Sequence, residues 1–156
     1  DGHDRVAINN ASGTRRPDLL KVTVGFDGGF LADGGISYAG PNALARAKLA
    51  RDIIAERMTN LHGIKDQMRL DIIGLDSLHG TAVDRPSNSQ DVRFRGALRS
   101  SSRDVAELFL WEIEALFTSG PAGGGGYRGS ITATVVTHSA SIERKLVSTS
   151  LTILTV

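Results

Sequence analysis

The segment DVRFRGALRSSSRDVAELFLWEIEALFTS, residues 91–119, contains one half of a two-layer fold. Its first ten residues alternate between apolar and polar side chains, which is typical of a strand with one buried face. Ser101 and Asp104 resemble a capping box at the start of a helix. Apolar residues then recur at helical spacing, namely Val105, Phe109, Ile113 and Leu116. The segment therefore predicts a strand followed directly by an amphipathic helix.

The other half of the fold precedes this segment. Residues 41–63 predict a helix, with Pro41 at its first position and Gly63 as its C-terminal stop. Its apolar positions recur with a helical period: Ala43, Ala47, Ala50, Ile54, Met58 and Leu61. Residues 19–26, 68–75 and 130–139 are rich in β-forming residues and predict three further strands.

The order of these elements is β-α-β-β-α-β, which is the ferredoxin-like split βαβ pattern. We therefore expect an α+β fold with two helices on one face of the sheet. The short strand-like segments 5–8 and 146–156 predict one added strand at each end. Nothing in the sequence resembles an internal linker, so residues 1–156 are expected to form a single domain.

The predicted topology brings three unusual segments to one rim of the sheet. Right-handed crossovers make the first two core strands parallel, with the third running between them in the opposite direction. The segments that follow the first strand, the second strand and the second helix then end at the same rim. These segments are residues 27–40, 76–90 and 119–128, and two of them are rich in glycine.

The composition excludes several classes of function. The net charge is only +1, from 18 basic and 17 acidic residues, which argues against nucleic acid as the main partner. The chain has no cysteine, which excludes disulfides, thiolate catalysis and cysteine zinc sites. Because the chain has no signal pattern or long apolar run, we expect a cytoplasmic protein with no membrane partner. No histidine or carboxylate cluster has metal-ligand spacing, so we predict no metal site.

Three segments together resemble the acyclic terpene utilization AtuA family. They are DGGFLADGGISYAGPNALARAKLA, LDIIGLDSLHG and LFTSGPAGGGGYRGS, in this order along nearly the whole chain. Family members carry Glu-Gly-Gln before ISYAG, where this chain has Asp33, Gly34 and Gly35. The resemblance implies the C-terminal part of a longer protein, whose N-terminal α/β portion is the expected partner. The sequence start, DGHDRVAINN, fits a chain that begins inside a longer protein.

The resemblance also implies a metabolic setting. The family is associated with the breakdown of acyclic terpenes such as citronellol and geraniol, which proceeds through branched acyl-CoA thioesters. A CoA thioester is therefore the expected substrate, and no cofactor is expected.

The glycine-rich segments suggest an anion site, because backbone N–H groups approach a ligand closely where side chains are absent. The candidate substrate-binding residues lie in two groups. The first group spans the first glycine segment and the following helix start: Gly28, Gly29, Gly34, Gly35, Ser37 and Asn42. The second group follows the second helix: Gly123, Gly124, Gly125, Gly126 and Arg128. Turn formation alone would also explain many of these glycines.

Four residues are candidates for acid–base catalysis. Asp33 is a candidate to take a proton from the carbon next to a thioester carbonyl, and Tyr38 is a candidate to donate to an oxyanion. His79 is a candidate general acid or base, with Asp76 orienting its ring. A turn-forming aspartate, a packed tyrosine and a surface histidine are the alternatives. The segment FRGALR, residues 94–99, is interpreted as an ordinary solvated face.

We therefore expect part of an enzyme that acts on an anionic acyl thioester by proton transfer, hydration or lyase chemistry. The chain alone is expected to be inactive. The alternative is a non-catalytic module, either for homo-oligomerisation or for small-molecule regulation. The sheet edges and Trp111 are the features that support oligomerisation.

Overall fold

The computed structural model describes residues 2–80 and 89–154. These residues form two compact units. The larger unit, residues 26–136, contains both helices and most of the sheet. The smaller unit combines residues 1–25 with residues 137–156.

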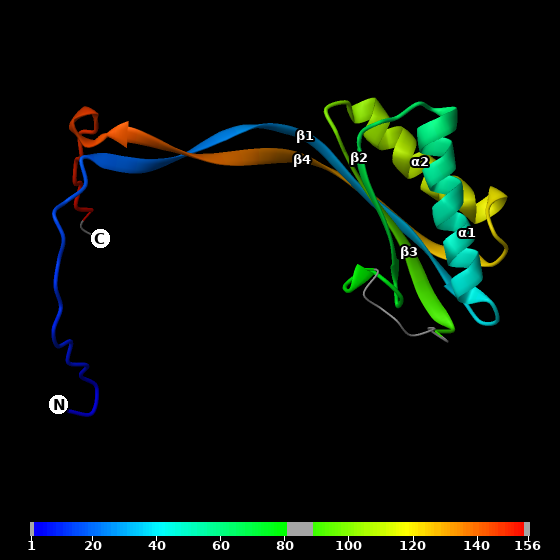
Figure 1. Cartoon of the computed structure of the whole chain (residues 1–156), viewed down its shortest axis with the longest axis horizontal. Coiled ribbons are helices and arrows are strands. Elements are labelled where there is room, and N and C mark those ends of the chain that lie inside the picture. Colours follow the sequence, from blue (N-terminus) through cyan, green and yellow to red (C-terminus); the bar gives the residue numbers. More distant parts are fainter. Residues whose placement is uncertain (1, 81–88, 155–156) are drawn as a thin grey trace. The chain divides into compact units, whose positions relative to one another are not determined.

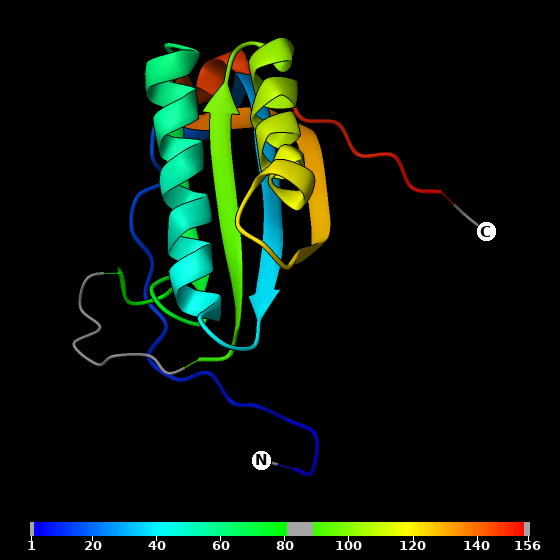
Figure 2. The same cartoon turned by 90° about the vertical axis from the view of Figure 1, so that its right-hand side faces the viewer.

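The sheet has four strands in the order β2-β3-β1-β4. These are β1 (Leu19–Ala39), β2 (Gln67–Ile73), β3 (Asp91–Ser100) and β4 (Gly124–Glu143). Strand β3 pairs antiparallel with both β1 and β2. The helices α1 (Ala43–Glu56) and α2 (Arg103–Ser119) lie on one face of this sheet (Figures 1 and 2). The predicted ferredoxin-like α+β fold is confirmed.

The core fills the space between the sheet and the two helices. Strands β1, β2 and β3 contribute every second side chain to it, because successive residues of a strand point to opposite faces. Among its members, Ile36, Phe94, Phe109 and Ile54 are fully buried. Helix α1 contributes the small residues Ala43, Ala47 and Ala50, which let it pack closely on the sheet.

The sequence predicts that the first strand ends at residue 26 and that a glycine-rich loop follows, but in the structure β1 continues through this segment to Ala39, so the loop prediction was wrong. Gly34 of β1 pairs directly with Gly96 of β3. A Cβ atom on Gly34 would lie 2.7 Å from Leu110 Cδ2, and one on Gly96 would lie 2.7 Å from Phe109 Cζ. The two glycines therefore form a shallow groove in the sheet where α2 packs, and their role here is close packing.

Three boundaries also differ from the predictions. Strand β4 begins at Gly124, so most of the second glycine segment is strand as well. The N-cap of α2 is Ser102, whose side chain accepts a hydrogen bond from the Val105 N–H at 3.4 Å, so the capping residue is not Ser101. The added strands expected at 5–8 and 146–156 are absent from the described residues, and longer β1 and β4 strands are present instead.

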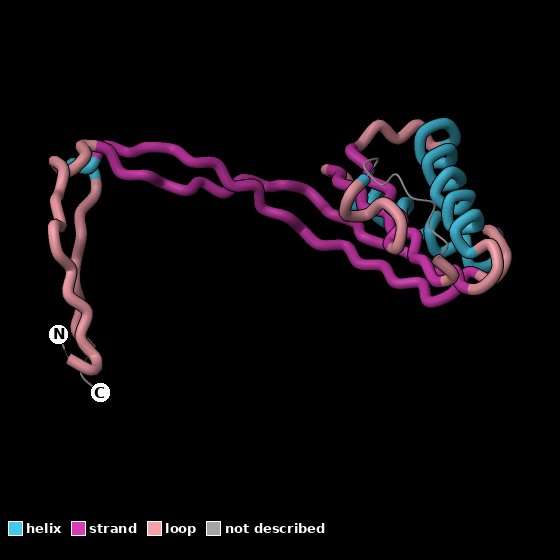
Figure 3. The backbone as a smooth tube through the Cα atoms, turned by 60° about the horizontal axis from the view of Figure 1, so that its bottom comes forward, coloured by secondary structure: helices cyan, strands magenta, loops and turns pink. Residues whose placement is uncertain are grey.

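The smaller unit contains the outer ends of β1 and β4, which run side by side as a two-stranded ribbon (Figure 3). A 3-10 turn, Arg144–Leu146, follows β4. The Arg144 backbone N–H donates to Asp18 O at 2.8 Å, and its Nε donates to Pro17 O at 2.8 Å. These two bonds tie the segment after β4 to the segment before β1.

Candidate functional site

Of the three segments predicted to share a rim, the structure brings together the end of 27–40, the end of 76–90 and the middle of 119–128. Residues 27–39 run along the sheet as part of β1, and residues 81–88 lie outside the described residues. The Gly40 N–H, just after β1, donates to Gln90 O, just before β3, at 2.7 Å. The Arg46 guanidinium donates to Ala39 O and to Ala122 O, each at 2.7 Å. The end of β1, the start of β3 and the loop after α2 are therefore neighbours.

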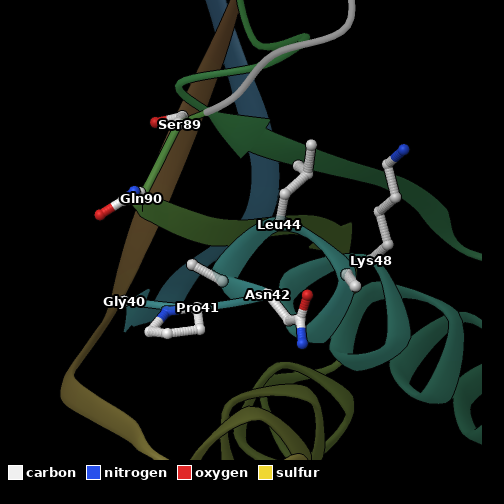
Figure 4. Close-up of a pocket in the computed structure, with 9 residues that line it drawn as sticks. Gly40, Pro41, Asn42, Leu44, Lys48, Ser89 and Gln90 are labelled. Carbon is white, nitrogen blue, oxygen red and sulfur yellow. The ribbon is translucent and has the colours of Figure 1, made fainter.

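A hollow of about 420 Å³ lies at this rim beside the start of α1. Figure 4 shows Pro41 and Asn42 at the helix start, Lys48 further along α1, and Gln90 from the segment before β3. Asn42 adopts a left-handed conformation with φ of 60°, and its side chain makes no capping bond. The predicted binding residue Asn42 thus lines this rim hollow.

A second hollow, of about 390 Å³, lies on the helix-free face of the sheet. We call it the arginine hollow. Because Gly34 and Gly96 face α2, strand alternation points the neighbouring Asp33, Gly35 and Arg95 to the opposite face. The hollow is lined by Asp33, Gly34, Gly35, Ile73, Arg93, Arg95, Arg128, Gly129 and Ser130.

Each of the three arginines of this hollow makes hydrogen bonds, and Arg128 NH1 donates to Tyr127 O at 3.0 Å. Arg95 Nε donates to both oxygens of Asp33, at 3.2 and 3.0 Å, and its NH2 group also bonds Asp33. This hydrogen bonding raises the pKa of Arg95 above its usual value. Arg93 donates to Ser37 Oγ and Gly126 O at 3.0 Å and to Gly35 O at 2.9 Å. Within the described residues, neither Arg93 nor Arg128 pairs with a carboxylate.

The arginine hollow unites several residues that the sequence singled out from separate segments. Asp33, Gly34, Gly35 and Arg128 line it directly, while Ser37 and Gly126 hold Arg93 in place. Sequence reasoning missed Arg93 and Arg95, since residues 94–99 were interpreted as a solvated face. The spacing of the arginines at 93, 95 and 99 puts them on one face of a strand, but it does not show that any of them shares a hollow with β1 and β4.

The candidate acid–base residue Tyr38 lies on the opposite side of the sheet from Asp33. Its side chain is fully buried under the helices, and burial raises its pKa, with the nearby Arg46 acting in the opposite direction. Arg46 lies over the Tyr38 ring, 5.8 Å from its centroid. In the described part of the chain the Tyr38 hydroxyl has no hydrogen-bond partner.

Asp76 and His79 lie in the turn after β2 and line neither hollow. Asp76 Oδ1 accepts the Ile72 N–H at 2.6 Å, and Oδ2 accepts a hydrogen bond from Arg51 at 3.3 Å. The Asp76 bonds found in the structure therefore stabilise this turn, while His79 is exposed.

The remaining predicted glycines are found in two further places. Gly29 has φ of 70°, and its N–H donates to Asp27 Oδ1 at 2.9 Å, which forms a local turn within β1 beside Gly28. Gly123, Gly124 and Gly125 lie where α2 leads into β4, and a Cβ on Gly123 would lie 2.7 Å from Arg46 NH1. The predicted binding residues thus lie in three places: the rim, the arginine hollow, and the part of β1 around Gly28 and Gly29.

In residues 2–80 and 89–154, no three His, Asp or Glu side chains lie close enough together to hold a metal ion. No helix in the same residues has the length and apolar character needed to cross a membrane.

The fold and the site define an α+β domain with an arginine-lined hollow on its helix-free sheet face. The chain belongs to the AtuA family: the family described as "Acyclic terpene utilisation family protein AtuA" matches residues 1–153. No curated protein matches the chain. Among solved structures, the de novo designed protein Ferredog-Diesel is similar with 17% identity and a TM-score of 0.42, over 67% of this chain and 87% of that one.

Proposed function

We propose that this chain binds an anionic acyl thioester of acyclic terpene breakdown in the arginine hollow, as part of an enzyme. The observation that carries the proposal is the charge of the hollow. Arg93, Arg95 and Arg128 line it, together with one carboxylate, Asp33. This local excess of positive charge is larger than expected for a chain with a net charge of +1.

Guanidinium groups are well suited to phosphate and carboxylate groups, because their planar N–H donors match two oxygens at once. The charge of Arg95 is offset by Asp33, so Arg93 and Arg128 supply the excess. Three hydrogen bonds hold Arg93 in one position, which lowers the ordering cost of binding an anion. Arg128 is exposed, and its NH1 group donates a hydrogen bond to Tyr127 O.

The glycine at position 35 makes room for this arrangement. A Cβ atom there would lie 2.5 Å from Phe94 O and 3.2 Å from Arg93 Nε. Gly35 therefore lets the Arg93 side chain lie across the sheet surface and donate to Gly35 O and Ser37. This supports a role for the Asp33-Gly34-Gly35 stretch in shaping the hollow.

Asp33 is the proposed proton acceptor. Its carboxylate lines the hollow and is held by Arg95, and in this proposal it accepts a proton from the carbon next to the thioester carbonyl. The proposal leaves Tyr38, Asp76 and His79 outside this step, because they lie away from the hollow. A partner portion of the enzyme would supply the remaining catalytic groups.

Isothermal titration calorimetry with isovaleryl-CoA, CoA and free isovalerate tests this proposal. We expect the thioester to bind, and Arg128→Ala to weaken it about tenfold, since one charged contact is worth about 1.4 kcal/mol. Arg99→Ala is the control: Arg99 is an exposed arginine on the same face of β3 as Arg93 and Arg95, but it does not line the hollow. Absence of thioester binding, or an equal loss in both variants, would overturn the proposal.

A further inference from the structure

Strand β4 forms one outer edge of the sheet. Since the strand order is β2-β3-β1-β4, β4 pairs with β1 on one side, and no strand of the described residues pairs with its other edge (Figure 2). Proteins commonly protect such edges with charged residues, prolines or very short strands. Between Arg128 and His138 the sequence GSITATVVT contains no charge and no proline. This edge therefore lacks the usual protection against pairing with another strand.

The edge is chemically complementary to itself. Residues 131–135 read ITATV, which is nearly symmetric about Ala133. If a second copy pairs antiparallel around a two-fold axis at Ala133, Ile131 lies opposite Val135 of the second copy. Thr132 then lies opposite Thr134 of the second copy. Cross-strand pairs of β-branched residues and of threonines stabilise antiparallel sheets.

An apolar hollow lies next to the same edge, between α2 and the start of β4. Its volume is about 680 Å³, and we call it the α2 patch: Trp111, Glu114, Ala115, Phe117, Thr118, Ser119 and Tyr127. Trp111 and Phe117 are each 59% exposed, and Val135 on the edge strand itself is 72% exposed. Exposed aromatic residues of this kind are enriched at protein–protein interfaces.

From these features we infer that the chain forms a two-fold symmetric dimer through antiparallel pairing of β4 with β4 of a second copy, centred on Ala133. A two-fold interface uses the same surface on both copies, and a self-complementary edge strand meets this requirement. The inference is independent of the proposed thioester binding.

The first test is the mass in solution, measured by light scattering on the full chain. We expect twice the protomer mass of 16.6 kDa. Val135→Lys places a charge opposite Ile131 of the second copy and should raise the dimer dissociation constant at least tenfold. Leu49→Lys is the control, because Leu49 is an exposed apolar residue on α1, away from β4, and its dimer should persist. Circular dichroism verifies that both variants are folded.

The second test does not depend on how Val135→Lys folds. The natural chain has no cysteine, so a single introduced thiol can be followed without background. Ala133→Cys should form a disulfide-linked dimer under mild oxidation, because the two-fold axis places position 133 opposite itself. Leu49→Cys should remain unlinked. A wild-type chain that is still monomeric at about 100 µM, a concentration well above the dissociation constant of a stable dimer, would overturn the inference. A dimer that is insensitive to Val135→Lys and does not form a disulfide through position 133 would overturn it as well.

Discussion

At the scale of single residues, Arg46 holds the rim together. Its guanidinium donates to Ala39 O and Ala122 O at 2.7 Å and to Pro41 O at 3.0 Å. These carbonyls belong to the end of β1, the start of α1 and the loop after α2. One side chain therefore connects the β1–α1 junction to the loop after α2, 76 positions further along the chain.

We expect Arg46→Met to lower the free energy of unfolding by about 2 kcal/mol, because hydrogen bonds from a charged group are lost and carbonyl acceptors are left without partners. Arg46→Lys should recover only part of this loss, since an ammonium group does not have the fork geometry of a guanidinium. Urea denaturation measures the change. Lys48→Met on the same helix is the control and should change stability by less than about 0.5 kcal/mol.

Glu112 is a buried carboxylate on α2 that joins this helix to the end of α1. It accepts hydrogen bonds from Arg57 Nε and NH2 at 2.6 and 2.8 Å, and it lies 2.6 Å from His62 Nε2. The pKa of Glu112 is lowered, chiefly by the hydrogen bond from Arg57 and further by His62, while burial acts in the opposite direction. The carboxylate therefore holds its proton less tightly in the folded chain than in the unfolded chain.

Because the pKa of Glu112 is lower in the folded chain than in the unfolded chain, its contribution to stability depends on pH. The contribution of Glu112 is fully present above its ordinary pKa of 4.5 and is lost as the pH falls through the lower folded value. We expect Glu112→Gln to be less stable than wild type by about 2 kcal/mol at pH 7, with a difference that shrinks below pH 4.5. Urea denaturation between pH 7 and pH 3 measures this difference. A constant difference across this range would contradict the assignment, and Glu107→Gln on the exposed face of α2 is the control.

At the scale of elements, the glycines of β1 and β3 determine how closely α2 packs on the sheet. We expect Gly96→Ala to destabilise the fold by about 1 to 3 kcal/mol, because its Cβ would lie 2.7 Å from Phe109 Cζ and 3.0 Å from Ile113 Cδ1. Gly125→Ala is the matched control, since nothing lies within 4 Å of its Cβ position. Equal thermal stability of the two variants would show that α2 can shift to accommodate the added methyl group.

The sequence predicted the helices well because their pattern is local. The sheet is faced by the periodic alanines and isoleucine of α1 and by the apolar stripe of α2. The glycines of β1 were misinterpreted because the constraint that favours glycine there is not local. A side chain at position 34 would clash with Leu110 of α2, which lies 76 positions further along the chain. Glycine is common in turns and uncommon inside strands, so sequence alone favours the wrong choice.

The candidate site was predictable to a similar extent. Asp33 and Arg128 stood out beside glycines, and strand directions predicted that the end of β1, the start of β3 and the loop after α2 meet at one rim. Arg93 and Arg95 became visible only when β3 was paired with β1, which places Arg95 opposite Gly35 in the register. Charged residues on an exposed strand face carry no local sign of a shared hollow, so the sequence could not distinguish them from ordinary solvated side chains.

At the scale of the whole molecule, the buried core lies entirely in one of the two units. The buried residues found in the described part of the chain run from Ala32 to Leu116, within residues 26–136. The apolar residues of the smaller unit that are largely exposed, such as Val6, Ile8 and Leu151, contribute little to burial. Since burial of apolar area is the main favourable term in folding, the larger unit should fold without the smaller one.

We therefore expect a chain shortened to residues 26–136 to unfold cooperatively in urea, with a free energy of unfolding within about 1 kcal/mol of the full chain. A chain shortened further to residues 43–136 lacks β1, an inner strand between β3 and β4, and should not fold. Far-UV circular dichroism during urea titration distinguishes the three chains. A large loss of stability in the 26–136 chain would show that the ribbon of β1 and β4 in the smaller unit stabilises the core, because the two strands are continuous between the units.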